Sequence, residues 1–284
     1  MTLHRPESLK DALDILVNAA GSGPAVVAGG TDLYPALRDG AAPAELLDVS
    51  AIAGLRGITR LDDGWRIGAA TRWADVVAAE LPPAFDGLKQ AAREVGSVQI
   101  QNAGTVAGNI CNASPAADGV PPLLTLDAIV ELASQSGVRH LPLGEFILGP
   151  RRTALREGEI MTALMVPDQN GQGAFIKLGA RRYLVISIAM VAARLVLDQG
   201  RMAQVALSVG AASPRAVRLP ELEAALLGQP IDRAEEIIGA AVLPQVDPID
   251  DVRASAAYRR DAVRTLLARV IAQASQMKEP RNVA

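Results

Sequence analysis

The stretch from Glu94 to Asp127 constrains this chain most, because it is polar and rich in small residues within a sequence that is half hydrophobic. It reads EVGSVQIQNAGTVAGNICNASPAADGVPPLLTLD and lacks the alternation of a half-buried strand. Disorder is disfavoured, since the stretch carries few charges and apolar runs flank it on both sides. We therefore predict a long ordered loop whose small hydrogen-bonding groups hold a large polar ligand.

A glycine-bearing turn lies upstream, from Ala28 to Asp32, with the sequence AGGTD directly after a predicted short strand. Successive backbone N–H groups in such a turn can form an anion site, and a following helix would add its dipole. Glycine also lets the backbone approach a pyrophosphate closely. An ordinary tight turn between a strand and a helix fits this segment equally well. The chain contains neither GxGxxG nor GxxxxGK[ST], so a usual Rossmann or P-loop site is unsupported.

The polar stretch offers a second set of ligand-binding groups. Thr105, Gly108 and Asn109 supply a hydroxyl, an open backbone and an amide. Asn112 and Asp118 extend the set, and an aspartate beyond a phosphate-binding loop is suited to a ribose hydroxyl. The alternative is an Ω-loop whose polar side chains satisfy only its own backbone.

Composition excludes several classes of function. The lone cysteine, Cys111, can form neither an internal disulfide nor a metal cluster within the chain, and two histidines cannot make a histidine-rich metal site. No nucleophile motif or histidine–metal motif occurs, so we predict no catalytic residues and no metal ligands. A net charge of −3 and 3% aromatic residues give no reason to expect a nucleic-acid partner. The N-terminus lacks the apolar core of a signal peptide, and no run is long enough to span a membrane, so a soluble cytoplasmic protein is expected.

Hydrophobic periodicity predicts a chain of both helices and strands. The first part contains a helix over 9–18 that is capped by Ser8, a strand over 25–28, a short helix within 32–38 and a strand over 45–49. The middle part contains a hairpin with its turn at Asp63-Gly64, a helix capped by Thr71, a helix after Pro83, and strands over 128–133, 138–141 and 159–166. The last part contains strands over 174–178, 188–197 and 203–209 followed by three helices, the last of them over 255–275.

Two motifs together resemble a known family. AGGTDL at 28–33 and QNAGTVAGNICNASPAADGVPPLLTLDA at 101–128 closely resemble the FAD-binding medium subunit of molybdenum hydroxylases, the xanthine dehydrogenase and carbon monoxide dehydrogenase flavoproteins. Supporting matches are HRPESLKDAL near the start, GPRRTALREGEIMTALMVP at 149–167, FIKLGARR at 175–182 and SAAYRRDAVRTLLARV at 255–270. The resemblance covers essentially the whole chain in order, and the pair of motifs is more specific than either alone.

The resemblance implies the PCMH-type FAD-binding fold, in which two α+β subdomains clasp FAD. Their expected ranges are 1–54 and 55–170, and a C-terminal α+β domain over 171–284 would pack a three-stranded antiparallel sheet against helices. Carried over by position, residues from both motifs and two later residues would contact FAD. The pyrophosphate would be wrapped by Val27, Ala28, Gly29, Gly30, Thr31 and Asp32; Thr105, Gly108, Asn109 and Asn112 would form a second loop; Ile110 and Cys111 would lie near the flavin ring, Asp118 on the ribose side, and Leu155 and Lys177 on the far side.

By the same resemblance, the chain is expected to be an oxidoreductase subunit that transfers electrons. A large molybdopterin subunit would oxidise the substrate, and a small subunit with two 2Fe–2S clusters would pass electrons to the FAD of this chain. The final acceptor would be NAD⁺, oxygen or another compound. The lone cysteine agrees with this division, because the clusters must reside on another chain.

The chain departs from the family pattern at two places. Gln101 stands where many relatives have arginine, and Tyr183 to Ile186 replace a segment that usually carries an aspartate. The cysteine-bearing insertion of 4-hydroxybenzoyl-CoA reductases is absent, which argues against that branch.

Two alternative functions remain. One is a self-sufficient flavoenzyme of related fold, although no proton donor is evident; the other is a flavin-free scaffold, although Gly29, Gly30 and Asn109 are all present.

Overall fold

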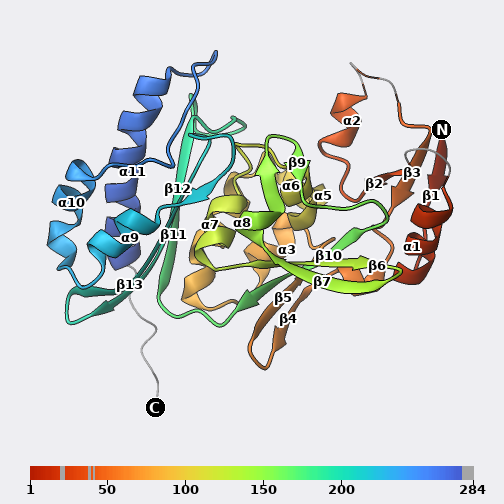
Figure 1. Ribbon diagram of the computed structural model, residues 1–284, viewed down its shortest axis with the longest axis horizontal. Helices are drawn as coiled ribbons and strands as arrows, with labels where there is room; N and C mark the ends of the chain where they lie inside the picture. Colours follow the sequence, from red (N-terminus) through yellow and green to blue (C-terminus); the bar gives the residue numbers. More distant parts are fainter. Residues whose placement is uncertain (20–22, 38–39, 41, 277–284) are drawn as a thin grey trace.

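The computed structural model describes residues 1–19, 23–37, 40 and 42–276. Three groups of elements follow one another along its longest axis (Figure 1), in the order of the sequence. The N-terminal group holds a three-stranded sheet, the central group a five-stranded sheet, and the C-terminal group a four-stranded sheet with the longest helix. The α+β class predicted from the sequence is confirmed.

The N-terminal sheet is parallel, with the order β1-β3-β2. Its elements are β1 (Thr2–His4), α1 (Leu9–Asn18), β2 (Ala25–Val27), α2 (Leu33–Ala36) and β3 (Glu45–Asp48). Helix α1 begins where predicted, because Ser8 Oγ accepts a hydrogen bond from the Asp11 N–H at 3.1 Å. Its buried face, Ala12 and Leu13, packs in one apolar cluster with Leu47 of β3. Helix α2 is a single turn within the predicted range 32–38, of which Arg38 lies outside the described residues.

The central sheet is antiparallel, with the order β4-β5-β10-β6-β7. Its strands are β4 (Ile58–Leu61), β5 (Gly64–Gly68), β6 (Ile129–Ser134), β7 (Gly137–Pro142) and β10 (Ile160–Pro167). The smaller pieces around it are the 3-10 helices Ala53–Leu55 and Pro83–Phe85, α3 (Trp73–Ala78), α4 (Asp86–Glu94), α8 (Leu143–Phe146), β8 (Ile147–Gly149) and β9 (Arg152–Thr153). Trp73, Phe85 and Phe146 are completely or almost completely buried in the core between this sheet and its helices.

The prediction of a long loop over 94–127 was wrong. The segment forms three short helices, α5 (Val98–Ala103), α6 (Val106–Asn112) and α7 (Val120–Thr125). Ser97 and Thr105 cap the first two through their side chains, and Pro121 occupies the first turn of α7, where its missing N–H costs nothing. Each helix has at most seven residues, so a helical period of 3.6 repeats too few times to be recognised in the sequence.

Two smaller predictions in the central group were also wrong. The hairpin turn is Asp62-Asp63. Gly64 already belongs to β5, where it pairs with Leu61 of β4. Thr71 does not cap α3; its buried hydroxyl donates to the Gly57 carbonyl at 3.0 Å. The helix begins after Arg72, whose N–H donates to the Asp75 carboxylate at 3.1 Å. The cap is thus supplied by a carboxylate inside the first turn.

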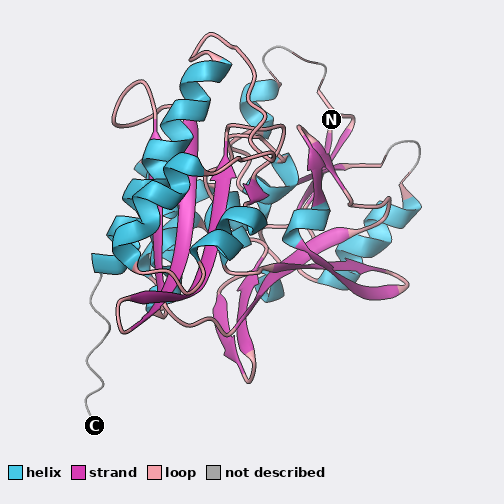
Figure 2. Ribbon diagram, turned by 60° about the vertical axis from the view of Figure 1, so that its left-hand side comes forward, coloured by secondary structure: helices cyan, strands magenta, loops and turns pink. Residues whose placement is uncertain are grey.

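The C-terminal sheet has four strands in the order β11-β12-β13-β14, which corrects the predicted three. They are β11 (Gln172–Leu178), β12 (Ala189–Asp198), β13 (Arg201–Gly210) and β14 (Val217–Arg218). The additional strand has only two residues, too few to show an alternating pattern. Helices α9 (Pro220–Leu226), α10 (Ala234–Ala240) and α11 (Ala256–Gln276) and the 3-10 helix Ile231–Arg233 complete this group. Helix α11 lies against the sheet (Figure 2), and its predicted apolar stripe is confirmed, since those side chains are buried in the core of this group.

The start of α11 is fixed by a buried arginine. Arg259 donates to the Asp251 carboxylate at 2.6 Å and to the carbonyls of Ile188 and Ala211. Burial alone would raise the pKa of Asp251, but hydrogen bonds from the Arg253 and Ala254 N–H groups and from Arg259 outweigh burial and hold the pKa at about 2. The ionised carboxylate therefore stabilises the fold.

We expect this contribution to disappear in acid. A carboxyl whose pKa is lowered by folding stabilises the protein above its unfolded pKa, and the contribution is lost as the pH falls toward about 2. Asp251→Asn should therefore reduce the free energy of unfolding at pH 6, with a loss that shrinks steadily below about pH 4. Urea denaturation between pH 6 and pH 3 measures it. Asp247→Asn, at an exposed carboxylate, is the control; equal losses at every pH would contradict the assignment.

Candidate ligand-binding site

The turn from Ala28 to Asp32 follows β2 and packs directly against the junction of α5 and α6. A Cβ atom on Gly29 would lie 2.7 Å from the carbonyl carbon of Ala103 and 2.9 Å from Cα of Gly104. Gly30 has a φ of +68°, and a Cβ there would overlap the ring of the Tyr34 side chain. Gly29 therefore requires glycine because backbone atoms cannot move aside, and Gly30 requires it because its positive φ would strain any other residue.

The same turn presents backbone donors to its surroundings. The Gly30 and Asp32 carbonyls accept hydrogen bonds from the Tyr34 and Ala36 N–H groups. In contrast, the hydrogen bonds of the described residues assign no partner in the chain to the N–H groups from Gly29 to Asp32. A run of unpaired N–H groups suits an anion. Because α2 is one turn long, the helix dipole expected from the sequence contributes little here.

The two sequence motifs meet at this turn. Asn112 Nδ2 donates to Asp32 Oδ1 at 2.7 Å, which joins residues 80 positions apart. Thr105 Oγ1 accepts from the Gly108 N–H at 3.1 Å and so fixes the start of α6. Asn109 Oδ1 is buried without a hydrogen-bond partner, which is costly for an amide oxygen unless a ligand supplies a donor.

Two cavities lie side by side at the junction. The larger has a volume of about 970 Å³ and the smaller about 690 Å³. Both are lined by Val26, Ala28, Thr105, Gly108 and Cys111, so the two spaces adjoin across the glycine turn and the start of α6. Together they form a two-part site that is large enough for an extended ligand.

Thirteen of the fifteen site residues predicted from the sequence line the larger cavity. They are Val27, Ala28, Gly29, Gly30, Thr31, Asp32, Thr105, Gly108, Asn109, Cys111, Asn112, Asp118 and Lys177. Leu155 lines the smaller cavity. Ile110 lines neither, because its side chain is completely buried in the central core beneath α6.

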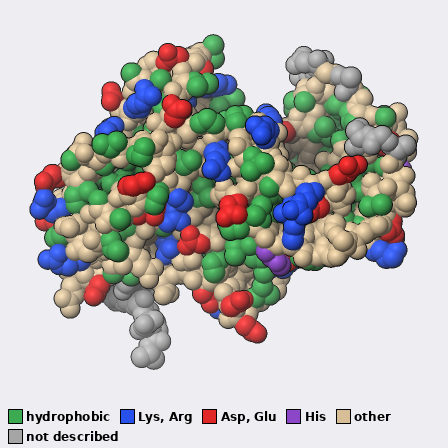
Figure 3. Space-filling model, viewed as in Figure 1, with side chains coloured by type: hydrophobic (Ala, Val, Ile, Leu, Met, Phe, Trp, Pro, Cys, Tyr) green, Lys and Arg blue, Asp and Glu red, His purple; other side chains and the backbone are tan. Residues whose placement is uncertain are grey.

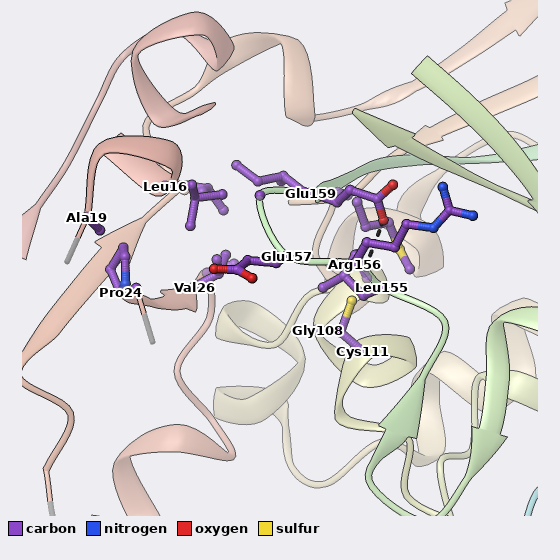
Figure 4. A pocket seen from close by; sticks show the side chains of 18 of the residues that line it. Leu16, Ala19, Pro24, Val26, Gly108, Cys111, Leu155, Arg156, Glu157 and Glu159 are labelled. Carbon is purple, nitrogen blue, oxygen red and sulfur yellow. Dashed lines mark hydrogen bonds between the residues drawn. The ribbon is translucent and has the colours of Figure 1, made fainter. Parts of the chain in front are cut away.

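The smaller cavity has apolar walls and an acidic edge (Figure 4). Leu16, Val26 and Leu155 approach it from different elements, and Glu157 also lines it. Glu159 also lines it, but Arg139 holds that carboxylate at 2.7 Å. The hydrogen bond from Arg139 lowers the pKa of Glu159. Glu157 is the exposed acceptor at this end of the site.

The larger cavity has a buried ion pair in its wall. Lys177 Nζ lies 2.6 Å from Asp118 Oδ2, and both side chains are less than one-tenth exposed. Asp118 Oδ1 accepts from the Ser187 hydroxyl at 2.6 Å, so chain donors occupy both of its oxygens. Burial raises the pKa of Asp118, against the attraction of Lys177 and the two hydrogen bonds. Lys177 lies near the end of β11 and Ser187 lies just before β12, so this edge of the C-terminal sheet forms part of the site.

Several residues of the larger cavity were not predicted. Val95, Gly96 and Ile100 come from the polar stretch, and Arg151 follows β8. Leu184, Val185 and Ile186 form another wall; the sequence had marked this segment only as a departure from the family pattern. The available signal in the sequence was a run of apolar residues between two predicted strands. In the structure Leu184 and Ile186 are more than half exposed, which is unusual for apolar side chains without a ligand or partner.

Cys111 borders both cavities but is not a reactive thiol. Burial raises its pKa to about 12, so the sulfur stays protonated at neutral pH.

Within the described residues, no three His, Cys, Asp or Glu side chains are grouped as a metal site would require. The same part of the chain contains no helix that is both long and apolar enough to cross a bilayer. Positive and negative side chains are interspersed on the face shown in Figure 3, without an extended basic stripe.

The sequence matches two family models in succession. Residues 1–169 match the FAD binding domain in molybdopterin dehydrogenase, and residues 174–274 match the CO dehydrogenase flavoprotein C-terminal domain. A xanthine dehydrogenase FAD-binding subunit from Escherichia coli O157:H7 is 33% identical, over 95% of this chain and 94% of that protein. The glyceraldehyde dehydrogenase medium chain of Sulfolobus acidocaldarius is 32% identical, over 92% of this chain and 94% of that protein.

Solved structures agree with these sequence matches. A chain of carbon monoxide dehydrogenase from Hydrogenophaga pseudoflava superposes with a TM-score of 0.87 at 28% identity, and the match covers 97% of both chains. A chain of reconstituted carbon monoxide dehydrogenase from Oligotropha carboxidovorans gives a TM-score of 0.89 at 25% identity, over 98% of both chains. The likeness therefore extends over all three sheets.

Proposed function

The chain belongs to the family that joins the FAD-binding domain of molybdopterin dehydrogenases to the CO dehydrogenase flavoprotein C-terminal domain, and we propose that its two cavities bind FAD for electron transfer. It is the FAD-binding medium subunit of a molybdenum hydroxylase and thus part of an oxidoreductase. When bound, FAD supplies the redox chemistry, because it exchanges electrons singly or in pairs.

The residues at the glycine turn fit the pyrophosphate of FAD. The N–H groups from Gly29 to Asp32, which have no partner among the hydrogen bonds of the described residues, would donate to its oxygens, and the absence of side chains at the glycines lets it approach. Thr105, Gly108 and Asn112 bound the same space from α6, and the buried Oδ1 of Asn109 would accept a hydrogen bond from a hydroxyl group of FAD, since the pyrophosphate itself has no donor. The meeting of these two motifs between the cavities is the observation that carries the proposal.

The chemistry of the walls suggests how the two ends of FAD are arranged. Adenine carries an exocyclic amine, a donor suited to the carboxylate of Glu157 in the smaller cavity. The flavin ring carries carbonyl oxygens and ring nitrogens, acceptors suited to the ammonium of Lys177 in the larger cavity. We assign the adenine end to the smaller cavity, with Leu155, and the flavin end to the larger.

The remaining cofactors belong to partner chains in this proposal. A small subunit with 2Fe–2S clusters supplies electrons, a large molybdopterin subunit oxidises the substrate, and NAD⁺ or another acceptor receives the electrons. This chain would bind FAD, exclude water from it and tune its potential. The subdomain ranges 1–54, 55–170 and 171–284 are part of the same proposal; residues 1–54 and 55–170 would clasp the cofactor.

The electron-transfer role is tested on the complex purified from its native host by a tag on this chain. Molybdenum, iron and FAD should be present together, and an oxidisable substrate should bleach the flavin absorbance. The same substrate should leave the isolated FAD-loaded chain oxidised. Substrate turnover by the isolated chain would instead show a self-sufficient flavoenzyme, and a complex that contains molybdenum without FAD would show a scaffold.

A further inference from the structure

A serine outside the family motifs completes the buried ion pair of the larger cavity. The Ser187 hydroxyl donates to Asp118 Oδ1 at 2.6 Å, and the serine is only 2% exposed. Asp118 Oδ2 is then the oxygen that faces Lys177, at 2.6 Å. The three residues come from three places, namely the turn before α7, strand β11 and the end of the loop before β12.

Lys177 retains one donor for the cavity. An ammonium group has three N–H donors, and two are directed to Asp118 Oδ2 and, at 3.3 Å, to the Glu94 carbonyl. Lys177 lines the larger cavity, so its remaining donor is available to a bound acceptor. The direction of that donor depends on where the carboxylate of Asp118 is held.

We propose that Ser187 is a positioning residue for the flavin, acting through Asp118 to hold the Lys177 ammonium toward the larger cavity. The inference rests on the proposed function, because it requires the flavin end of FAD in that cavity. With Ser187 bound to Oδ1, the carboxylate cannot turn both oxygens to the ammonium. Without the hydroxyl, Oδ1 is a buried acceptor lacking a partner, and Lys177 is the nearby group that can satisfy it. The ammonium then leaves the cavity.

The consequence is a change in redox potential. Reduction adds negative charge to the flavin ring, and a fixed ammonium beside the ring favours the reduced form. Ser187→Ala should therefore lower the midpoint potential of bound FAD while FAD still binds in stoichiometric amount. At a fixed potential, we expect the ratio of reduced to oxidised flavin to fall about tenfold. This change corresponds to a midpoint potential about 30 mV lower for a two-electron couple.

The experiment is a spectroelectrochemical titration of FAD in the full chain. Ser187→Thr retains the hydroxyl and should keep the native potential. Ser208→Ala is the matched control, because Ser208 is a completely buried serine of β13 whose hydroxyl donates to the Val217 carbonyl at 2.9 Å. Its potential should stay native. A native potential in Ser187→Ala would overturn the inference.

A second variant keeps the test decisive if Ser187→Ala fails to retain FAD. Ser187→Cys preserves the size of the side chain but donates weakly, so its potential should fall in the same direction. A native potential in Ser187→Cys would then overturn the inference. If the proposed function were wrong, the unaltered chain itself would contain no FAD, and this result distinguishes that failure from a failure of the Ser187 inference.

Discussion

Gly29→Ala is expected to weaken FAD binding about 100-fold while leaving most of the fold intact. The added Cβ would overlap backbone atoms of Ala103 and Gly104, which cannot yield without separating the glycine turn from α6. The anion site is built from both of these elements, so its geometry would be lost. We expect a cost of about 3 kcal/mol in FAD binding, about 100-fold in Kd. Titration of the apoprotein with FAD, followed by flavin fluorescence, measures this loss.

Gly54→Ala is the matched control for that variant. A Cβ on Gly54 meets nothing within 4 Å, and the residue lines neither cavity. The FAD affinity of Gly54→Ala should equal that of the unaltered chain. Circular dichroism separates loss of binding from loss of folding. Native FAD affinity in a folded Gly29→Ala protein would disprove the placement of the pyrophosphate.

Lys177→Met is expected to have the largest effect on stability. It leaves the buried carboxylate of Asp118 without its cation, which typically costs about 3–5 kcal/mol. The flavin end of the cofactor also loses its charged donor, so FAD binding should weaken. Urea denaturation of the apoprotein isolates the first effect. The double variant Lys177→Met with Asp118→Asn should recover most of the stability but not the FAD affinity, since it removes both charges.

The pH dependence of Lys177→Met follows from the carboxyl. Burial already raises the pKa of Asp118, and removing Lys177 raises it further. A raised pKa destabilises the fold above the unfolded pKa, and the penalty disappears as the pH falls below about 4, where the unfolded group is also protonated. The loss in the free energy of unfolding caused by Lys177→Met should therefore become smaller as the pH falls from 7 to 4. Lys10→Met, in the exposed pair with Asp14, should show little deficit at any pH; a constant Lys177→Met deficit would contradict the buried-pair account.

The sequence allowed most of the residues that line the larger cavity to be predicted, because they are concentrated in two short segments. The glycine turn follows β2 as expected, and the hydrogen bond between Asn112 and Asp32 brings the second segment beside it. What local patterns could not provide was the pairing of distant segments. That came from the family resemblance, and the shared cavities agree with it.

The placement of Ile110 shows why the polar stretch was misinterpreted. On the short helix α6, Thr105, Gly108 and Asn112 recur at helical spacing and face the cavity, while Ile110 points into the core. Treating the stretch as a loop removed the reason to assign Ile110 to the opposite face. Lys177 and Leu155 depended on resemblance alone, since neither stands within a polar motif.

Ser187 had no signal in the sequence. It lies in an apolar segment, and its partner Asp118 is 69 positions away. The short strand β14 was missed for a similar reason, because its two residues are recognised only by pairing with Ser208 and Val209. Contacts of this kind depend on tertiary packing, which periodicity and turn chemistry do not encode.

The most direct test of the account is the cofactor content of the purified chain. We would express the full chain alone, record its visible spectrum, release any cofactor with acid and identify it by mass. The account predicts a flavin spectrum and FAD in stoichiometric amount, with Gly54→Ala like the unaltered chain and Gly29→Ala depleted. A folded, colourless chain that also refuses added FAD would contradict it, and the two cavities would then have to serve a different ligand.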